Sequence, residues 1–149
     1  MGRVVIDDHL LRDVLSGGPT VDLERLATDG LATTGLWLYR LCSSFADPNV
    51  AGKLSAPVRA LPRESQANFR AQLTALPAEI EVLPLRDLAW LMAELQRRHR
   101  ADGRALSAAM AEALAAAHRL EAGMAVSALD VGPNLRAACE IDGIAFHIL

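Results

Sequence analysis

The sequence predicts an α/β protein with three layers, α/β/α, in which helices cover both faces of a mainly parallel sheet. Short apolar runs typical of buried strands recur along the chain, and segments with apolar residues at helical spacing separate them. Glycine, proline and aspartate mark many of the boundaries between the two kinds of segment. The length of 149 residues fits a single domain over residues 1–149.

The first strand is predicted at residues 3–6, where valine and isoleucine form a short apolar run. The run stops at the polar residues 7–9, and leucines and valines at helical spacing then predict a helix over 9–15. Ser16-Gly17-Gly18-Pro19 ends this helix. Residues 20–32 are ambiguous, and Asp22 to Leu26 fit either a short helix or an irregular stretch.

A largely buried helix is predicted over residues 36–45, with Thr33 or Thr34 as its N-cap. Proline, glycine and aspartate over residues 46–63 predict a loop with at most one helical turn. The aromatic residues Trp37, Tyr39 and Trp90 stand at helical spacing, and we expect them in the core rather than on a base-stacking surface.

The next helix is predicted over residues 65–76, and alternating apolar and charged residues then predict a strand at 79–85. Asp87 can cap the helix that follows, which carries its apolar face on residues 88–95 and frays at 96–100.

An alanine-rich helix is predicted over residues 105–121, with Gly123 as its C′ glycine. A buried strand follows at 124–127 and a helix at 130–138, which has proline in its first turn. The chain closes with a strand at 144–149.

Composition excludes several classes of protein. A hydrophobic content of 52% argues against disorder, and a net charge of −3 argues against a wholly cationic nucleic-acid-binding surface. No apolar run reaches the ~18 residues of a membrane span, and Asp7-Asp8 interrupts the N-terminal run before it could form a signal peptide. We therefore expect a cytoplasmic protein without a membrane partner.

Acidic residues follow the predicted strands at the points where ligands bind in parallel α/β sheets. Asp7 and Asp8 come directly after the first strand, and Asp130 follows the strand at 124–127. Glu112 lies in the alanine-rich helix that leads into that strand. Such carboxylates can hold Mg²⁺ or Mn²⁺, because hard cations prefer oxygen ligands. The alternative is structural, with the aspartates as helix caps and Glu112 on a solvated face.

Three motifs resemble those of the PIN-domain nucleases, in the same order along the chain. They are the opening run Val4–Leu11, the alanine-rich run Glu112–Gly123, and Met124–Ser127 followed by Asp130. The resemblance implies a Mg²⁺- or Mn²⁺-dependent ribonuclease similar to bacterial toxins, with an antitoxin-like protein partner and a candidate homodimer. It implies Asp7, Glu112 and Asp130 as metal ligands, with Asp8 assisting in catalysis.

The family resemblance implies a second acidic residue on the predicted helix at 36–45, and this sequence lacks it. Residues 35–41 contain no acid, and Arg40 stands in that helix. We expect the Arg40 guanidinium near Asp7 or Asp130, as a fixed positive charge in place of a metal. This favours a second hypothesis, a catalytically degenerate PIN-like domain that binds a protein or RNA. A small-molecule or phosphate-binding α/β domain is a third.

The candidate RNA contacts are the arginines of the basic cluster around residues 96–104, which can bind phosphates. They are Arg97, Arg98, Arg100 and Arg104. The alternative is an ordinary solvated helix end, where cations suit the helix dipole. His9, beside the acidic turn, is a further candidate for contact with a phosphate.

Overall fold

The computed structural model of the protein describes residues 2–50 and 52–149. Its five strands form one parallel sheet in the order β3-β2-β1-β4-β5. The strands are β1 Val4–Ile6, β2 Leu31–Thr33, β3 Ile80–Val82, β4 Gly123–Val126 and β5 Phe146–Ile148. Every pairing is parallel, which confirms the predicted α/β architecture.

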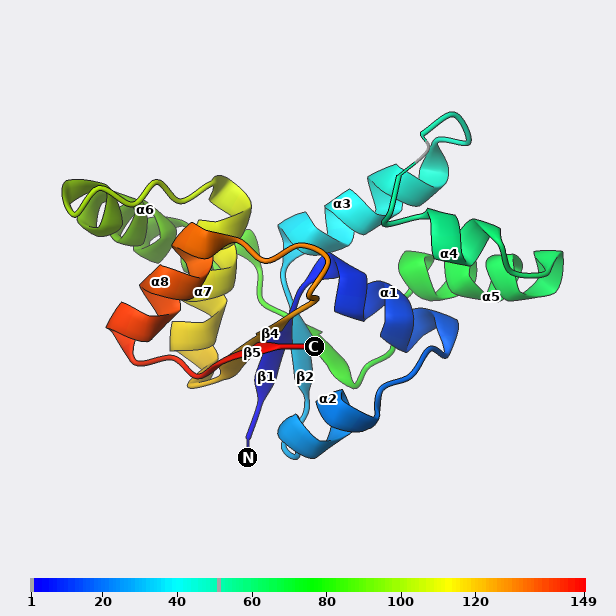
Figure 1. Cartoon of the computed structure of the whole chain (residues 1–149), viewed down its shortest axis with the longest axis horizontal. Coiled ribbons are helices and arrows are strands. Elements are labelled where there is room, and N and C mark those ends of the chain that lie inside the picture. The colour runs from blue at the N-terminus through cyan, green and yellow to red at the C-terminus, as the bar shows by residue number, and fades with distance from the viewer. Residues whose placement is uncertain (1, 51) are drawn as a thin grey trace.

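Helices connect the strands and lie on both sides of the sheet (Figure 1). The helices are α1 Asp8–Ser16, α2 Val21–Leu26, α3 Gly35–Ala46, α4 Ala56–Arg59, α5 Arg63–Thr74, α6 Leu85–Ala101, α7 Ala108–Leu120 and α8 Pro133–Asp142. Helices α6, α7 and α8 form the layer on the left of Figure 1, and α1, α4 and α5 lie on the right.

The two layers bury separate hydrophobic clusters, because successive side chains of a strand point to opposite faces. In β1, Val5 packs with the α6–α8 layer, whereas Val4 and Ile6 pack with the α1–α5 layer. Helix α3 contributes to both clusters, with Trp37 in the first and Leu41 in the second. It therefore links the two layers.

The structure resolves the ambiguous residues 20–32. Helix α2 is the short helix that was one of the two alternatives there, whereas strand β2 was not predicted. Strand β2, Leu-Ala-Thr, contains one β-branched residue, whereas the equally short β1 consists of three and was predicted from them. The predicted loop at 46–63 contains α4, as expected for one helical turn. Ala51 of that loop, and Met1 of the predicted domain, lie outside the described residues.

Several helix ends differ from the predictions. Thr34 caps α3 by accepting from the Trp37 N–H, which settles the choice between the two threonines. Pro84 rather than Asp87 precedes α6, so Asp87 lies in its first turn. Glu121, with φ 49°, takes the left-handed position at the end of α7, and Gly123 instead begins β4.

The aromatic prediction is right for one residue and wrong for two. Trp37 is buried, but Tyr39 and Trp90 are 66% and 78% exposed. Both lie on the outer faces of their helices, which periodicity alone did not separate from the packed faces. Within the described residues, no helix is long and apolar enough to cross a membrane.

Candidate functional site

A cavity of about 130 Å³ opens at the carboxyl ends of β1 and β4. In the sheet, β2 and β3 follow β1 on one side, whereas β4 and β5 follow it on the other. The direction in which successive strands are added therefore reverses between β1 and β4. Ligands of parallel α/β sheets bind at such reversal points. The lining residues are Asp7, Asp8, Trp37, Arg40, Ser107, Ala109, Met110, Val126, Asp130, Gly132 and Leu135. We call this cavity the acidic pocket.

Asp7 ends β1 and joins it to α1 and to β4. Its Oδ1 accepts from the Leu10 N–H at 2.9 Å as the N-cap of α1, and its Oδ2 accepts from the Ser127 N–H at 2.9 Å. Burial raises the pKa of Asp7 to about 7, against these two hydrogen bonds, which favour the ionised form. Asp7 thus combines the structural role of a cap with a perturbed carboxyl group in the pocket.

Asp8 and Asp130 share the guanidinium of Arg40. Arg40 Nε lies 3.2 Å from Asp8 Oδ2, and its NH2 lies 3.3 Å from Asp130 Oδ2. The expected position of Arg40 near Asp130 is therefore confirmed. The Asp8 Oδ2 atom is buried and has no aligned hydrogen-bond donor, so its contact with Arg40 is an ion pair only. Burial raises the pKa of Asp8, and the Arg40 charge opposes that rise.

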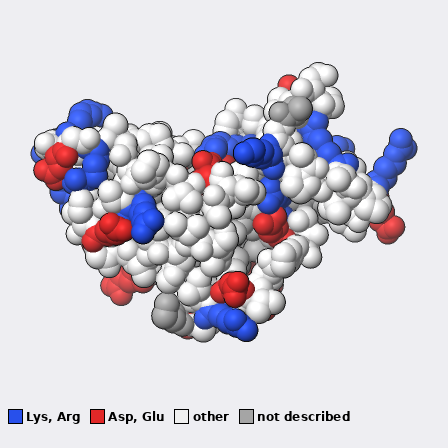
Figure 2. Space-filling model, viewed as in Figure 1, with Lys and Arg blue, Asp and Glu red and all other residues white. Residues whose placement is uncertain are grey.

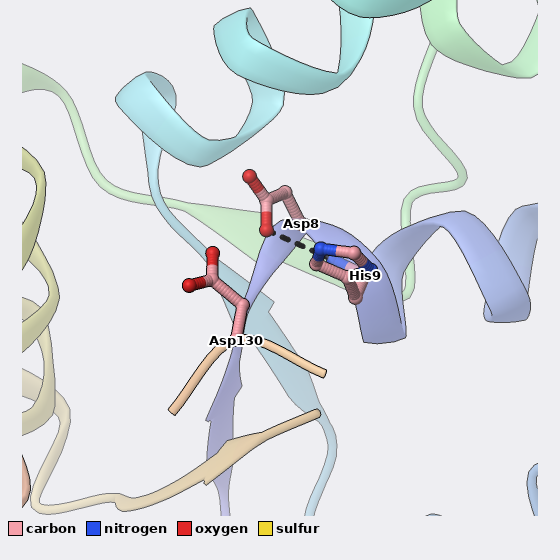
Figure 3. A group of neighbouring side chains, drawn as sticks. All are labelled: Asp8, His9 and Asp130. Atoms are coloured by element: carbon pink, nitrogen blue, oxygen red, sulfur yellow. Dashed lines mark hydrogen bonds between the residues drawn. The ribbon is translucent and has the colours of Figure 1, made fainter. Parts of the chain in front are cut away.

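Asp8, His9 and Asp130 offer ligand atoms that all lie within 4.8 Å of one another. Figure 3 shows Asp8 and His9 at the start of α1, and Asp130 facing them from the loop after β4. This is the one such group among the described residues. It differs from the metal ligands that the family resemblance implied, because it contains Asp8 and His9 in place of Asp7 and Glu112.

The contact of His9 with Arg12 fixes which ring nitrogen carries the proton. Arg12 NH1 lies 3.3 Å from His9 Nδ1, and arginine can only donate, so Nδ1 accepts. Neutral His9 then carries its proton on Nε2. Burial lowers the pKa of His9, which favours this neutral form. With Nδ1 engaged and Nε2 protonated, His9 has no free lone pair for a metal while Arg12 stays in place.

Glu112 lies on α7 and is 1% exposed, so it is not on a solvated face. Its Oε1 accepts from the Gly35 N–H at 3.2 Å, and its Oε2 accepts from the Leu36 N–H at 2.8 Å. The carboxylate thus satisfies the free amides at the N-terminus of α3, where a negative charge also suits the helix dipole. Both oxygens are already engaged with backbone groups.

The basic cluster lies away from the pocket. Figure 2 shows acidic and basic atoms together near the middle of the visible face, and a second mixed group at the left-hand end, where α6 lies. Arg98 pairs with Asp142, and Arg104 donates to His99 and pairs with Asp102. Arg97 and Arg100 are exposed. RNA contact by the four arginines remains a prediction.

Sequence reasoning placed Asp7, Asp8 and Asp130 at strand ends, and all three line the pocket. It did not identify Arg12 or the Ser127 N–H, which orient His9 and Asp7. Arg12 carried a weak signal, since it stands three residues after His9 and so on the same side of α1. The Ser127 contact spans 120 positions and carried none.

No family model matches the chain, and no curated protein sequence matches it. Solved structures do match its fold. One is FitAB bound to an IR36 DNA fragment, with a TM-score of 0.60 and 15% identity, covering 97% of this chain and 94% of that chain. Another is FitAcB from Neisseria gonorrhoeae, with the same TM-score and identity, covering 97% and 96%. These similarities confirm the PIN-like fold.

Proposed function

We propose that this PIN-like domain is a binding protein in which Arg40 replaces a metal ion, and that it does not cleave RNA at physiological Mg²⁺ concentrations. The observation that carries the proposal is the position of Arg40 between Asp8 Oδ2 and Asp130 Oδ2, at 3.2 and 3.3 Å. The guanidinium supplies the positive charge that a cation would otherwise bring to these two oxygens.

The donors of the pocket fit a divalent cation only in part. Asp8 Oδ2 lacks a hydrogen-bond donor and Asp130 is about half exposed, so both suit a hard cation once Arg40 moves away. Asp7 and Glu112 already use both oxygens on backbone amides. Helix α3 supplies no acid. We therefore expect Mg²⁺ to bind weakly.

The proposed partner is a small antitoxin-like protein. The solved structures of similar fold are named FitAB and FitAcB, and the first is bound to a DNA fragment. A protein partner of this kind needs no catalytic metal in the PIN-like subunit, so it is compatible with the Arg40 ion pairs.

A second candidate function is a metal-dependent ribonuclease, favoured by the convergence of Asp8, His9 and Asp130. Asp8 and Asp130 would hold Mg²⁺ or Mn²⁺, with Asp7 and Glu112 as the further acids that the family resemblance implies. A bound cation would lower the pKa of a water molecule and neutralise charge on the phosphate. His9, which carries its proton on Nε2, would donate to a phosphate oxygen rather than bind the cation.

The two functions are separated by metal binding and cleavage in parallel. Calorimetry with Mn²⁺ should show roughly tenfold tighter binding to Arg40→Ala than to the wild type, a difference of about 1.4 kcal/mol. Arg136→Ala is the control, because Arg136 pairs with Glu140 in α8 and does not line the pocket. The wild type should leave a mixed single-stranded RNA intact in Mg²⁺.

Cleavage of that RNA by the wild type in Mg²⁺, abolished by Asp130→Asn, would instead establish the nuclease. Asp130 is the better position for this substitution, because its side chain is 49% exposed and it caps no helix. Asp7→Asn would remove one of two backbone acceptors and disturb α1 as well.

A further inference from the structure

The sheet has two edge strands, and only one of them carries residues that discourage pairing with another chain. Strand β3, at one edge, contains Glu81 and follows Glu79, and Pro77 and Pro84 stand on either side of it. Charged residues and prolines protect natural edge strands in this way. Strand β5 lies at the other edge, and residues 144–149 contain no proline, aspartate, glutamate, lysine or arginine. This edge is therefore open to pairing.

The outer backbone groups of β5 have no neighbouring strand. The Leu149 N–H donates to the Val126 C=O at 2.9 Å, and the Leu149 C=O accepts from the Ala128 N–H at 2.7 Å. Successive residues of a strand direct their backbone groups to opposite sides, so those of Phe146 and Ile148 point away from β4. Within residues 2–50 and 52–149 no strand lies beyond β5, and Figure 1 shows no helix in front of it.

The surface beside β5 is apolar, and acidic groups lie at one end of it. Ile148 is 42% exposed, and Leu129, in the loop that follows β4, is 59% exposed. A cavity of about 280 Å³ at the carboxyl end of β5 is lined by Leu149 and other apolar residues and by Asp13 and Asp22. Figure 2 shows uncharged surface over β5, with acidic side chains close to its carboxyl end.

We infer that β5 binds an extended segment of another polypeptide, which adds a sixth strand to the sheet. The segment runs antiparallel to β5, because antiparallel pairing is the more stable per residue and needs no crossover connection. Its apolar side chains stand at alternate positions, and a lysine or arginine at its N-terminal end meets Asp22. The Asp22 side chain is 75% exposed and has only a 3.5 Å contact with Arg25.

The charges favour this occupant over a nucleic acid and over a second copy of the chain. Asp13 and Asp22 repel a polyanion. The β5 strand of a second copy would bring no cation to Asp22, because residues 140–149 contain no lysine or arginine. The residues that contact the segment do not line the acidic pocket, so the inference is independent of the proposed function.

The first test is amide hydrogen exchange, measured by NMR with a capped six-residue peptide that begins with arginine and then alternates valine and threonine. In the free protein the Phe146 and Ile148 amides should exchange rapidly, whereas the Leu149 amide should be protected. The peptide should slow exchange at Phe146 and Ile148 at least tenfold. A peptide with its arginine at the C-terminal end should bind at least threefold more weakly, because that arginine lies away from Asp22.

The second test is the affinity of variants for the same peptide. Ile148→Pro removes an outward N–H and keeps every hydrogen bond to β4, so it should weaken binding at least tenfold. Ile148→Val keeps that N–H and is its matched control. Asp22→Arg should weaken binding at least fivefold, and Glu64→Arg, at an exposed position on α5, should leave it unchanged.

Three results would overturn the inference. The first is unchanged exchange at Phe146 and Ile148 with the peptide at about 1 mM. The second is undiminished binding by Ile148→Pro and Asp22→Arg. The third is a free protein in which both outer amides are already protected because a second copy pairs with β5.

Discussion

Asp142 and Asp8 both carry buried carboxylates, and they differ in the number of donors that reach them. The Asp142 side chain at the end of α8 is 3% exposed and contacts Arg98 at 2.5 Å and His118 at 2.7 Å. His99 Nε2 lies 3.4 Å away. Asp8 is equally buried, but its Oδ2 has only the ion pair with the half-exposed Arg40.

Hydrogen-bond donors from two other helices surround the Asp142 carboxylate. Arg98 and His118 both hydrogen-bond to the carboxylate, and His99 Nε2 lies near it without a hydrogen bond. One carboxylate thereby joins α6, α7 and α8. A buried charge with this many partners stabilises the fold and leaves nothing for a ligand to satisfy.

The acidic pocket has the opposite balance, because Asp8 and Asp130 share one guanidinium and Asp7 adds a third carboxyl group beside them. Burial raises the pKa of both Asp7 and Asp8. An excess of acceptors over donors costs stability and is typical of a site that receives a cationic group. The comparison therefore separates a structural carboxylate from candidate functional ones.

The largest expected effect is at Asp142. Asp142→Ala should lower the free energy of unfolding by about 3 kcal/mol, because it leaves Arg98 and His118 without their shared acceptor. Urea unfolding at pH 7 measures the change. Asp130→Ala is the matched control and should change stability by less than about 1 kcal/mol, since its ion pair is largely exposed. Equal losses of stability in the two variants would show that the Asp142 and Asp130 carboxylates do not differ in their contribution to the fold.

The second-largest expected effect is the pH dependence of stability that Asp7 causes. Its pKa rises from 3.8 to about 7 on folding, so between these values the folded state binds one more proton than the unfolded state. The stabilisation is complete below the lower value and is lost as the pH rises through 7. Thermal and urea unfolding of the wild type should show a loss of about 1.4 kcal/mol per pH unit from this group.

Asp7→Asn should lose this part of the pH dependence, whatever its effect on stability at a single pH. The comparison of slopes between pH 5 and pH 7 is therefore the measurement that matters. A parallel pH profile for the two proteins would show that Asp7 is ionised throughout in the folded state.

The effect expected at Glu112 is smaller, since its two carboxylate oxygens accept from only two backbone N–H groups. Glu112→Gln keeps one acceptor and loses the charge at the N-terminus of α3, so we expect a loss of about 1–2 kcal/mol in stability. Denaturant unfolding measures it. Glu94→Gln, on the exposed face of α6, should have almost no effect and is the control for the chemical change.

The smallest effect is expected at Asp8, and it has the opposite sign. Asp8→Asn removes a carboxylate whose pKa burial raises, and it should increase stability at pH 8 by up to about 1 kcal/mol. At pH 4, where the wild-type carboxyl is protonated to a larger extent, the gain should shrink. A clear loss of stability at pH 8 would mean that the Arg40 ion pair outweighs the cost of burial.

Features set by a few neighbouring residues were predictable from the sequence. The strand Val4–Ile6 depends on a short run of β-branched residues, and the caps Asp7 and Thr34 each depend on an amide three positions further on. The exposure of Trp90 was not predictable, because apolar spacing shows that a helix packs but not how much of its surface is covered. Strand β2 was missed because Leu-Ala-Thr lacks the run of β-branched residues that marks Val4–Ile6 as a strand.

The sequence by itself determined the order of the elements apart from residues 20–33, and it placed acids at the ends of β1 and β4, because these follow from local pattern and strand direction. Only the tertiary structure decided which carboxylates have hydrogen-bond or ion-pair partners. Asp7 meets an amide 120 positions away, Asp130 meets Arg40 90 positions away, and Asp142 meets Arg98 44 positions away. The number of donors at a buried carboxylate depends on such distant partners, and no local pattern in the chain encodes it.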